Sequence, residues 1–556
     1  RETRLFNDNW KFIKIEPGTT GYENSDSWVN VDIPHDWLIY DTNNLYEDSE
    51  GWYRKTFDLQ TETGVRYALR FDGVYMEPVI YVNGAKAGEW KYGYNTFEID
   101  ITDYLVNGAN EIRVQVMHRS PNSRWYSGAG IFRNIWFKTM PDTHFVSDGI
   151  YIRTERTDTG YMLKASSEIS GSEFDAVAYT VFDMNGTAVV SKTTDAAADT
   201  VEIEVESPDE WDIDNPVCYV LRAELLCNGQ AVDCINTRFG FRTIEFNSDS
   251  GFYLNGRHVK LNGVCMHHDL GALGAAVNKA ALYRQLKMMK DMGANAIRTS
   301  HNMPAVELLD IADEIGLLVD NEAFDMWKMP KNRYDYARFF EEWAAKDMRN
   351  FVRRDRNHPC VIMWSIGNEI FDTHADEESG MRSTKLLYEA VIENDPDCNA
   401  YATFGSNFLE GEPTQRCADV LKLVGYNYSE RLYDAHHKAH PDWCIYGSET
   451  GSTLQSRDVY HFPYSEPILT DVDEQCSSLG NSACSWGAPD SEFCITTERD
   501  NKYSAGQFLW TGFDYIGEPT PYQTKNSYFG QVDTAGFPKD TYYICLLYTS
   551  PSPRDR

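Results

Sequence analysis

Two glutamates stand at the ends of strongly apolar segments. A carboxylate is unusual in such a place unless it has a structural or chemical role. Glu369 ends the run "VIMWSIGNE", and Glu449 ends the shorter run "CIYGSE". Both segments have the length and composition of buried strands. A structural ion pair is one explanation for Glu369. The other is chemical, because two carboxylates on one rim can divide the work of a general acid and a nucleophile.

The region from about residue 246 onward must position these glutamates. Short apolar strands alternate there with helical patterns such as "NKAALYRQLKMMKDMG", and eight strand candidates can be counted. The alternation predicts a (β/α)8 barrel over residues 246–543, with a doubly wound sheet as the alternative. Barrel active sites lie at the C-terminal ends of the strands. Glu369 and Glu449 would then face the same opening from the fourth and seventh strands.

The chain before the barrel is predicted to be all-β. Residues 1–142 contain many short strands, with Asn83-Gly84 at a hairpin turn, which indicates a jelly-roll sandwich. Residues 143–245 have the strand number of an immunoglobulin-like sandwich. Residues 544–556 resemble a translated sequencing adapter, so we expect a non-native tail and an incomplete last barrel helix.

The composition disfavours several function classes. The formal net charge is −34, which argues against binding to nucleic acids and to anionic membranes. No apolar run approaches 18 residues, so no membrane span is expected. The twelve cysteines form no CxxC pair and are interpreted as reduced thiols of a cytoplasmic protein. GxSxG, HExxH, P-loop and Rossmann glycine patterns are absent.

Six longer motifs occur in this order: "PHDW", "GAGIFRNIWF", "NGVCMHHD", "IRTSHNMP", "SIGNE" and "FDYIGEPTPY". Together with the order of the three domains, they resemble glycoside hydrolase family 2, which contains β-galactosidases and β-glucuronidases. The resemblance extends over residues 1 to about 543. It implies a retaining glycosidase built on a TIM barrel.

The resemblance also implies roles for individual residues. Glu369 would be the acid/base and Glu449 the nucleophile, while Tyr428 would orient Glu449. Asn368 would hydrogen-bond the sugar 2-hydroxyl. The other expected substrate-binding residues are Asp36, His267, His301, Trp510 and Asp514. Core packing for Trp510, a structural role for His267 and a turn cap for Asp36 remain alternatives.

A departure from the family pattern predicts the sugar. The glucuronidases of the family hold the substrate carboxylate with an Asn-x-Lys pair after the eighth strand. Ser527 and Phe529 stand at the matching positions, with Lys525 and Asn526 nearby in the reverse order. We therefore expect a retaining exo-β-galactosidase acting on terminal non-reducing β-D-galactosides. A β-glucuronidase and a non-catalytic carbohydrate-binding protein are the alternatives.

A second departure concerns metal. Large β-galactosidases of the family bind Mg²⁺ through a Glu-x-His after the third strand and the acid/base glutamate. The segment "NEAFDMW" offers Glu322 and Asp325 but no histidine. We expect no metal cofactor, and Mg²⁺ remains an alternative. The expected partner is a carbohydrate substrate, and assembly into a homo-oligomer is left open.

Overall fold

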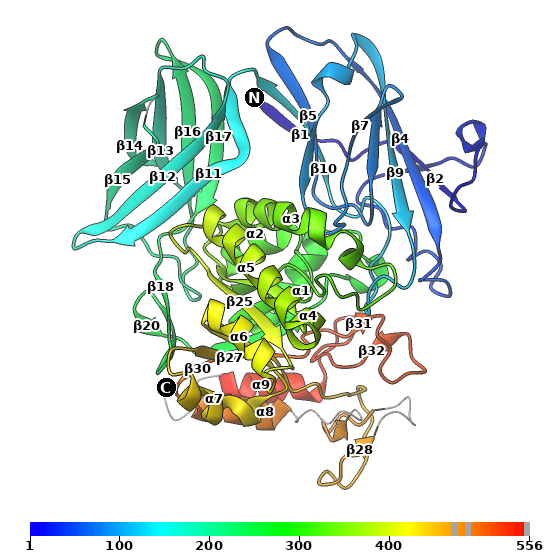
Figure 1. The fold of residues 1–556 in the computed structure, drawn as a ribbon, viewed down its shortest axis with the longest axis vertical. Helices are drawn as coiled ribbons and strands as arrows, with labels where there is room; N and C mark the ends of the chain where they lie inside the picture. Colours follow the sequence, from blue (N-terminus) through cyan, green and yellow to red (C-terminus); the bar gives the residue numbers. More distant parts are fainter. Residues whose placement is uncertain (197, 470–475, 484–490, 550–556) are drawn as a thin grey trace.

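The structure, a computed structural model, describes residues 1–196, 198–469, 476–483 and 491–549. It contains three domains in the predicted order. Two β-sandwiches, blue and cyan to green in Figure 1, lie above a barrel. None of the helices within these residues is long and apolar enough to cross a membrane.

The first sandwich pairs a four-stranded sheet, in the order β1-β10-β5-β8, with a six-stranded sheet, in the order β3-β2-β4-β9-β6-β7. Strand β9 shows why these residues form a sandwich: Ile112, Val114 and Val116 are buried and alternate with more exposed residues. The strands are β1 (Glu2–Leu5), β2 (Trp10–Ile15), β3 (Val29–Val31), β4 (Ser49–Leu59), β5 (Val65–Phe71), β6 (Val79–Val82), β7 (Ala85–Glu89), β8 (Phe97–Asp100), β9 (Gly108–His118) and β10 (Ile135–Pro141).

The second sandwich is immunoglobulin-like, with sheets in the orders β11-β12-β15 and β14-β13-β16-β17. It has a hydrophobic core of its own. In β15, Val201, Ile203 and Val205 are buried between exposed neighbours. The strands are β11 (His144–Arg156), β12 (Gly160–Ser170), β13 (Ala176–Asp183), β14 (Ala188–Asp195), β15 (Thr200–Glu206), β16 (Tyr219–Cys227) and β17 (Gln230–Phe239).

The third domain is a closed barrel of eight parallel strands, in the order β21-β22-β23-β24-β25-β26-β27-β30. All eight strand segments predicted from the sequence are confirmed. Every residue of β24 is buried, which explains why its sequence is mostly apolar. The strands are β21 (Leu261–Met266), β22 (Ala296–Thr299), β23 (Leu318–Glu322), β24 (Val361–Asn368), β25 (Tyr401–Ser406), β26 (Leu423–Asn427), β27 (Cys444–Thr450) and β30 (Ser504–Leu509).

Helices pack around the barrel strands through one apolar face. In α1, Leu282, Leu286 and Met289 are buried at helical spacing, and the Asn278 side chain caps the first turn by accepting from Ala281 N. The helices are α1 (Lys279–Asp291), α2 (Val306–Ile315), α3 (Phe340–Asp355), α4 (Phe371–Ala375), α5 (Glu377–Asn394), α6 (Glu412–Leu421), α7 (Tyr433–Ala439), α8 (Ser491–Asp500) and α9 (Asp540–Thr549).

Short strands complete the described structure. A three-stranded sheet precedes the first barrel strand, and two pairs lie in the connections around β30. These strands are β18 (Ile244–Asn247), β19 (Gly251–Leu254), β20 (Arg257–His258), β28 (Ile468–Leu469), β29 (Ser482–Ala483), β31 (Tyr515–Ile516) and β32 (Asn526–Ser527).

The last helix includes the start of the segment that the sequence marks as a non-native tail. Residues 544–549 of that segment belong to α9. Cys545 is buried, and the Thr549 hydroxyl donates to Met292 O at 3.3 Å, directly after α1. The first residues of this segment thus pack against the barrel, and their non-native origin stays a prediction. Residues 550–556 of the expected tail lie outside the described residues.

The first sandwich is fixed to the C-terminal rim of the barrel. The buried Arg133 guanidinium donates to Met303 O at 2.8 Å and to Pro304 O at 3.1 Å, just after β22. The Tyr92 hydroxyl donates to Ala323 O at 2.5 Å, just after β23. These contacts place the loops of the first sandwich beside the end of the barrel where strand-end chemistry is expected.

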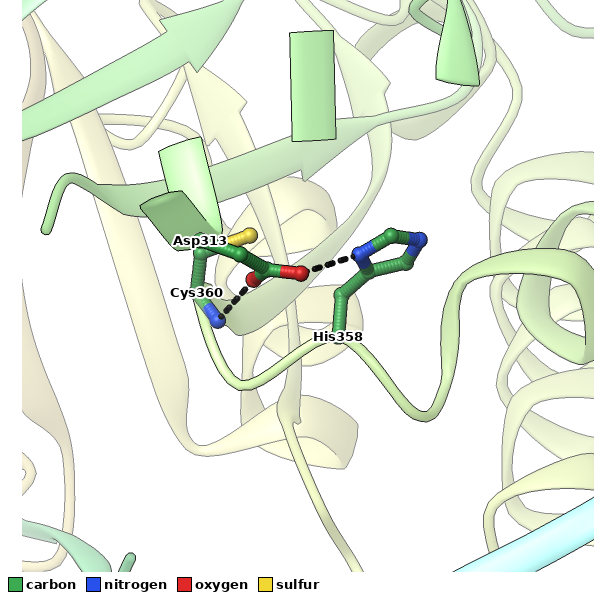
Figure 2. A group of neighbouring side chains, drawn as sticks. All are labelled: Asp313, His358 and Cys360. Carbon is green, nitrogen blue, oxygen red and sulfur yellow. Dashed lines mark hydrogen bonds and ion pairs between the residues drawn. The ribbon is translucent and has the colours of Figure 1, made fainter. Parts of the chain in front are cut away.

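A buried cluster joins α2 to the segment before β24. Asp313, His358 and Cys360 bring three potential metal-ligand atoms within 4.8 Å of one another (Figure 2). His358 Nδ1 lies 2.6 Å from one Asp313 oxygen, and Cys360 N donates to the other at 3.1 Å. The Cys360 thiol donates to Leu309 O at 3.6 Å. Because these groups already satisfy one another, the contacts describe a clamp between two elements rather than a metal centre.

This clamp should make stability depend on pH. Burial lowers the pKa of His358, but the Asp313 carboxylate outweighs burial and raises it to about 9. A raised folded-state pKa means that the stabilisation is complete below the unfolded pKa of about 6.5 and is lost as the pH rises through about 9. We expect His358→Gln to unfold several degrees below the parent protein at about pH 6, and the difference to shrink toward pH 9.5.

Thermal unfolding scans across this pH range test the prediction. The exposed His258 provides a matched control, because His258→Gln should leave the midpoint temperature unchanged at every pH. A deficit for His358→Gln that stays the same from acidic to alkaline pH would contradict an ion pair with Asp313.

Candidate active site

The barrel rim brings the two predicted catalytic glutamates together. Glu369 directly follows β24, and Glu449 lies in β27 beside Asn427 of β26, its partner in the parallel register. Asn427 Nδ2 donates to Glu369 Oε1 at 3.1 Å. The Tyr428 side chain is hydrogen-bonded to Glu449, and the charges of both glutamates act on it. Both carboxylates therefore border the end of the same strand.

A buried guanidinium organises the centre of the site. Arg298 comes from β22 and is fully buried. Its Nη1 donates to Glu449 Oε1 at 2.8 Å, and its Nη2 donates to Asn368 Oδ1 at 2.9 Å. Nε and Nη2 also donate to Glu322 Oε2, at 3.1 and 2.6 Å. One cation thus fixes side chains from three other strands by charge-assisted hydrogen bonds.

Both the oxygen and the nitrogen of the Asn368 side-chain amide are hydrogen-bonded within the protein. Its oxygen accepts from Arg298 and, at 3.1 Å, from Asn427 Nδ2, while its nitrogen donates to Asp325 Oδ1 at 3.0 Å. The second N–H of that nitrogen makes no hydrogen bond with the described residues. The amide is therefore oriented by the protein and still has one donor for another molecule.

Burial raises the pKa values of two carboxyl groups here. Burial raises the pKa of Glu449 to about 7, with Arg298 opposing the shift and Glu369 adding to it. Burial likewise raises the pKa of Glu322 to about 8, against the opposing effect of Arg298. The pKa of His301 is well below its usual value because of burial and the nearby Arg298, so this ring is neutral.

Aromatic rings and imidazoles surround the carboxylates. His301 Nδ1 lies 2.7 Å from Glu322 Oε1, and its Nε2 lies 3.5 Å from Glu449 Oε1. The Trp510 ring stacks on the His301 ring with centroids 5.1 Å apart. His267 contacts Trp510 at 5.3 Å and Trp125 of the first sandwich at 5.0 Å. The structure thus brings His267, His301 and Trp510 together, and their contact with a sugar stays a prediction.

The first sandwich also contributes a charge to the site. Arg124, in the loop between β9 and β10, donates to Asp325 Oδ1 at 2.9 Å. Its Nη1 lies 3.7 Å from Glu369 Oε2 and 3.5 Å from Glu518 Oε1. The candidate acid/base therefore has an arginine from another domain beside it.

Two predicted substrate-binding residues have their hydrogen bonds within the protein. Asp36 is buried and accepts from Leu38 N, Ala129 N, Ala275 N and the Tyr126 hydroxyl, at 2.6 to 3.1 Å. Its bond to Leu38 N is the turn cap named above as the alternative, and Ala275 lies in the barrel domain.

Asp514 is also hydrogen-bonded within the protein, through one carboxylate oxygen. One of its oxygens accepts from Lys539 Nζ at 2.6 Å and from Gly530 N at 2.8 Å. Both aspartates thus link segments of the protein, and their contact with substrate stays a prediction.

The residues at the position of the family's magnesium site do not fit a divalent cation. Asp325 Oδ1 already accepts from three donors, one of which is Lys331 Nζ at 2.8 Å. Lys331 Nζ also donates to Asn368 O at 2.9 Å. Mg²⁺ requires several oxygen ligands at about 2.0–2.1 Å, and an ammonium group stands among the available oxygens.

The sequence did not lead us to assign roles to four residues that contact the predicted site residues. These are Arg298, Asn427, Arg124 and Trp125. Arg298 carried a signal, since it is a charged residue inside the apolar strand "ANAIRTS". Asn427 carried another, because it stands next to Tyr428 at a strand end. Arg124 and Trp125 had no such signal, because only the docking of the first sandwich brings them to the barrel rim.

Comparison with known proteins agrees with this architecture. Residues 16–141, 141–242 and 246–430 match the sugar binding domain, a further domain and the TIM barrel domain of glycosyl hydrolases family 2. Fold and site thus define a glycoside hydrolase. The chain belongs to glycoside hydrolase family 2.

The names of related proteins specify different sugars. β-Galactosidase BoGH2A of Bacteroides ovatus is 37% identical, over 98% of this chain and 71% of that protein. A putative β-glucuronidase of Formosa agariphila is 32% identical, over 97% of this chain and 55% of that protein. The crystal structure of a β-glycosidase from Bacteroides vulgatus superposes with a TM-score of 0.89 at 30% identity, covering 100% of this chain and 76% of that one.

The raised pKa of Glu449 predicts the acidic side of the pH profile. If Glu449 must be ionised to react, activity falls as the pH falls through the pKa of about 7. We expect kcat/KM on an aryl glycoside with an activated leaving group to lose about tenfold per pH unit below this value. Glu369→Gln should move this limb to lower pH, because the Glu369 carboxylate contributes to the shift. An acidic limb near the ordinary glutamate pKa of about 4.3 would contradict the prediction.

Proposed function

We propose that this protein is a retaining exo-β-galactosidase that removes terminal non-reducing β-D-galactosyl residues. Glu449 attacks the anomeric carbon while Glu369 donates a proton to the departing glycosidic oxygen. A covalent galactosyl ester on Glu449 results. In the second step Glu369 takes a proton from water, which attacks the same carbon, releases the sugar and regenerates both carboxyl groups.

The surrounding groups support these roles. Arg298 and Tyr428 hold Glu449 in a fixed orientation and share its negative charge. The free amide N–H of Asn368 is available to a sugar 2-hydroxyl, a contact that strengthens in the transition state. The neutral His301 and the Trp510 ring offer a polar edge and an apolar face. A purely carbohydrate-binding protein would have no need for two carboxylates held in this way.

The charge balance of the site is the main support for a neutral sugar as the substrate. Each cation beside the glutamates already faces carboxylates, so none is left over for the carboxylate of a uronide. Among the described residues these groups are Arg298 with Glu322 and Glu449, Lys331 with Asp325, and Arg124 with Asp325, Glu369 and Glu518. The segments 470–475 and 484–490 lie outside the described residues. They contain neither lysine nor arginine, so they supply no further cation of this kind.

The residues at the family's uronide-binding positions support the same choice. Phe529 is buried, and the Ser527 hydroxyl donates to Gly517 O at 3.2 Å. Lys525, the nearby cation, donates to Thr42 O at 3.0 Å and to Asn43 Oδ1 at 3.1 Å in the first sandwich. Its ammonium group is therefore engaged in a domain contact.

The sugar is tested by assaying p-nitrophenyl β-D-galactoside beside the matching β-D-glucuronide. We expect kcat/KM to favour the galactoside by about two orders of magnitude, because an unpaired buried carboxylate costs several kcal/mol. A preference for the glucuronide would replace our choice with the uronidase alternative. Hydrolysis of neither sugar, with the β-glucoside and β-mannoside also inert, would favour the non-catalytic alternative.

The nucleophile is tested separately with Glu449→Gly. This variant should lose at least about 10⁴-fold in kcat, because no covalent intermediate can form. Azide should restore turnover of an activated aryl glycoside by entering the vacated space and giving a glycosyl azide of inverted anomeric configuration, detectable by NMR. Glu498→Gln serves as a control, since Glu498 is another buried glutamate, bonded to Ser504 in the barrel. Wild-type rates in Glu449→Gly would rule out this nucleophile.

A further inference from the structure

A buried lysine and a partly exposed arginine lie where the acid/base residue and the sugar-binding amide meet. Lys331, in the segment between β23 and α3, has a side chain only 5% exposed. Its ammonium group lies 2.8 Å from Asp325 Oδ1 and 2.9 Å from Asn368 O. It therefore ties the segment after β23 to the last residue of β24, one position before Glu369.

Arg124 reaches the same aspartate from the first sandwich. Its Nη2 donates to Asp325 Oδ1 at 2.9 Å, and its Nη1 lies 3.7 Å from Glu369 Oε2. Glu518 shares this guanidinium at 3.5 Å. Arg124 is thus in direct ionic contact with the candidate acid/base.

Asp325 connects the two cations to the amide. Burial would raise its pKa, but Arg124 and Lys331 outweigh burial and hold the pKa below its usual value. The resulting carboxylate accepts from Asn368 Nδ2 at 3.0 Å. The two cations therefore keep Asp325 ionised, and Asp325 in turn fixes the direction of the Asn368 amide.

We propose that Arg124 and Lys331 form a fixed cationic pair that positions Glu369 and Asn368, in place of a divalent metal ion. The proposal rests on the acid/base role assigned to Glu369. Arg124 and Lys331 are positioning residues, since they act through Glu369, Asp325 and Asn368. A side-chain cation cannot be removed by chelators, so the catalytic geometry is independent of metal supply.

Chelation tests the metal-free part of the proposal. After exhaustive treatment with EDTA and dialysis, the protein should retain kcat/KM to within about twofold, and added Mg²⁺ should change it by no more than that. Loss of about tenfold or more on chelation, reversed by Mg²⁺, would overturn the proposal.

The Arg124 side is tested by its dependence on the leaving group. We compare phenyl and 2,4-dinitrophenyl β-glycosides of whichever sugar the protein hydrolyses best. Arg124→Gln should lose at least about tenfold more kcat/KM on the phenyl glycoside, because only the poor leaving group needs a well-placed proton donor. Arg124→Lys should recover most of this loss. Equal losses on both substrates would show a structural role only and would overturn the proposal.

The Lys331 side is tested by chemical rescue. Lys331→Ala should lower kcat by about tenfold or more, and methylammonium ions should restore part of it by occupying the vacated space. Lys328→Ala is the matched control, because Lys328 lies in the same segment and pairs with Glu341 at the surface. It should neither lose activity nor respond to methylammonium. Full activity in Lys331→Ala would overturn the proposal.

Glu369→Ala, measured on the same two glycosides, separates this proposal from the proposed function. If Glu369→Ala itself shows no discrimination between leaving groups, the acid/base assignment fails. If it discriminates strongly and Arg124→Gln does not, the assignment stands and only the cationic pair is wrong.

Discussion

The buried ion-pair network around Arg298 is the interaction on which the rest of the site depends. A guanidinium without partners in a barrel core would cost several kcal/mol, so its hydrogen bonds to Glu322, Asn368 and Glu449 must all form. Space for it depends on Gly405 of β25, where a Cβ atom would lie 2.8 Å from Nη2. The barrel can satisfy this charge only when these strands are in register, and the same register brings the candidate catalytic carboxylates together.

The backbone at the ends of two strands adopts an unusual conformation at residues of the same site. Glu369 and Tyr428 have φ angles of 46° and 50°, in the left-handed region that non-glycine residues seldom occupy. Glycine would adopt this conformation freely but carries neither a carboxylate nor a phenol. The structure holds it with hydrogen bonds from Glu369 N to Gly405 O and from Tyr428 N to Glu449 O, both 2.8 Å. Local strain at these positions accompanies the residues assigned to chemistry.

The sequence predicts those features that local pattern and the barrel rule determine. Buried strands can be recognised in the sequence by their apolar runs. In a parallel barrel all strands end at the same rim, so Glu369 and Glu449 can be placed there without information on individual contacts. Features that depend on long-range packing escape such prediction. Arg124 and Asp325 are 201 positions apart in the chain, and no periodicity records such a pairing. The hydrogen bonds of Asp36 could not be predicted for the same reason, because its partners come from three separate segments.

These contacts make the first sandwich part of the candidate active site rather than an attached module. The barrel alone would present Asp325 with Lys331, but the guanidinium beside Glu369 and the Trp125 ring beside His267 come from the loop after β9. Arg133 and Tyr92 fix that loop's domain to the carbonyl groups after β22 and β23. The strand ends that carry the chemistry thus also carry the domain interface. The candidate active site therefore depends on how the first sandwich docks on the barrel, because that docking brings Arg124 and Trp125 to the rim.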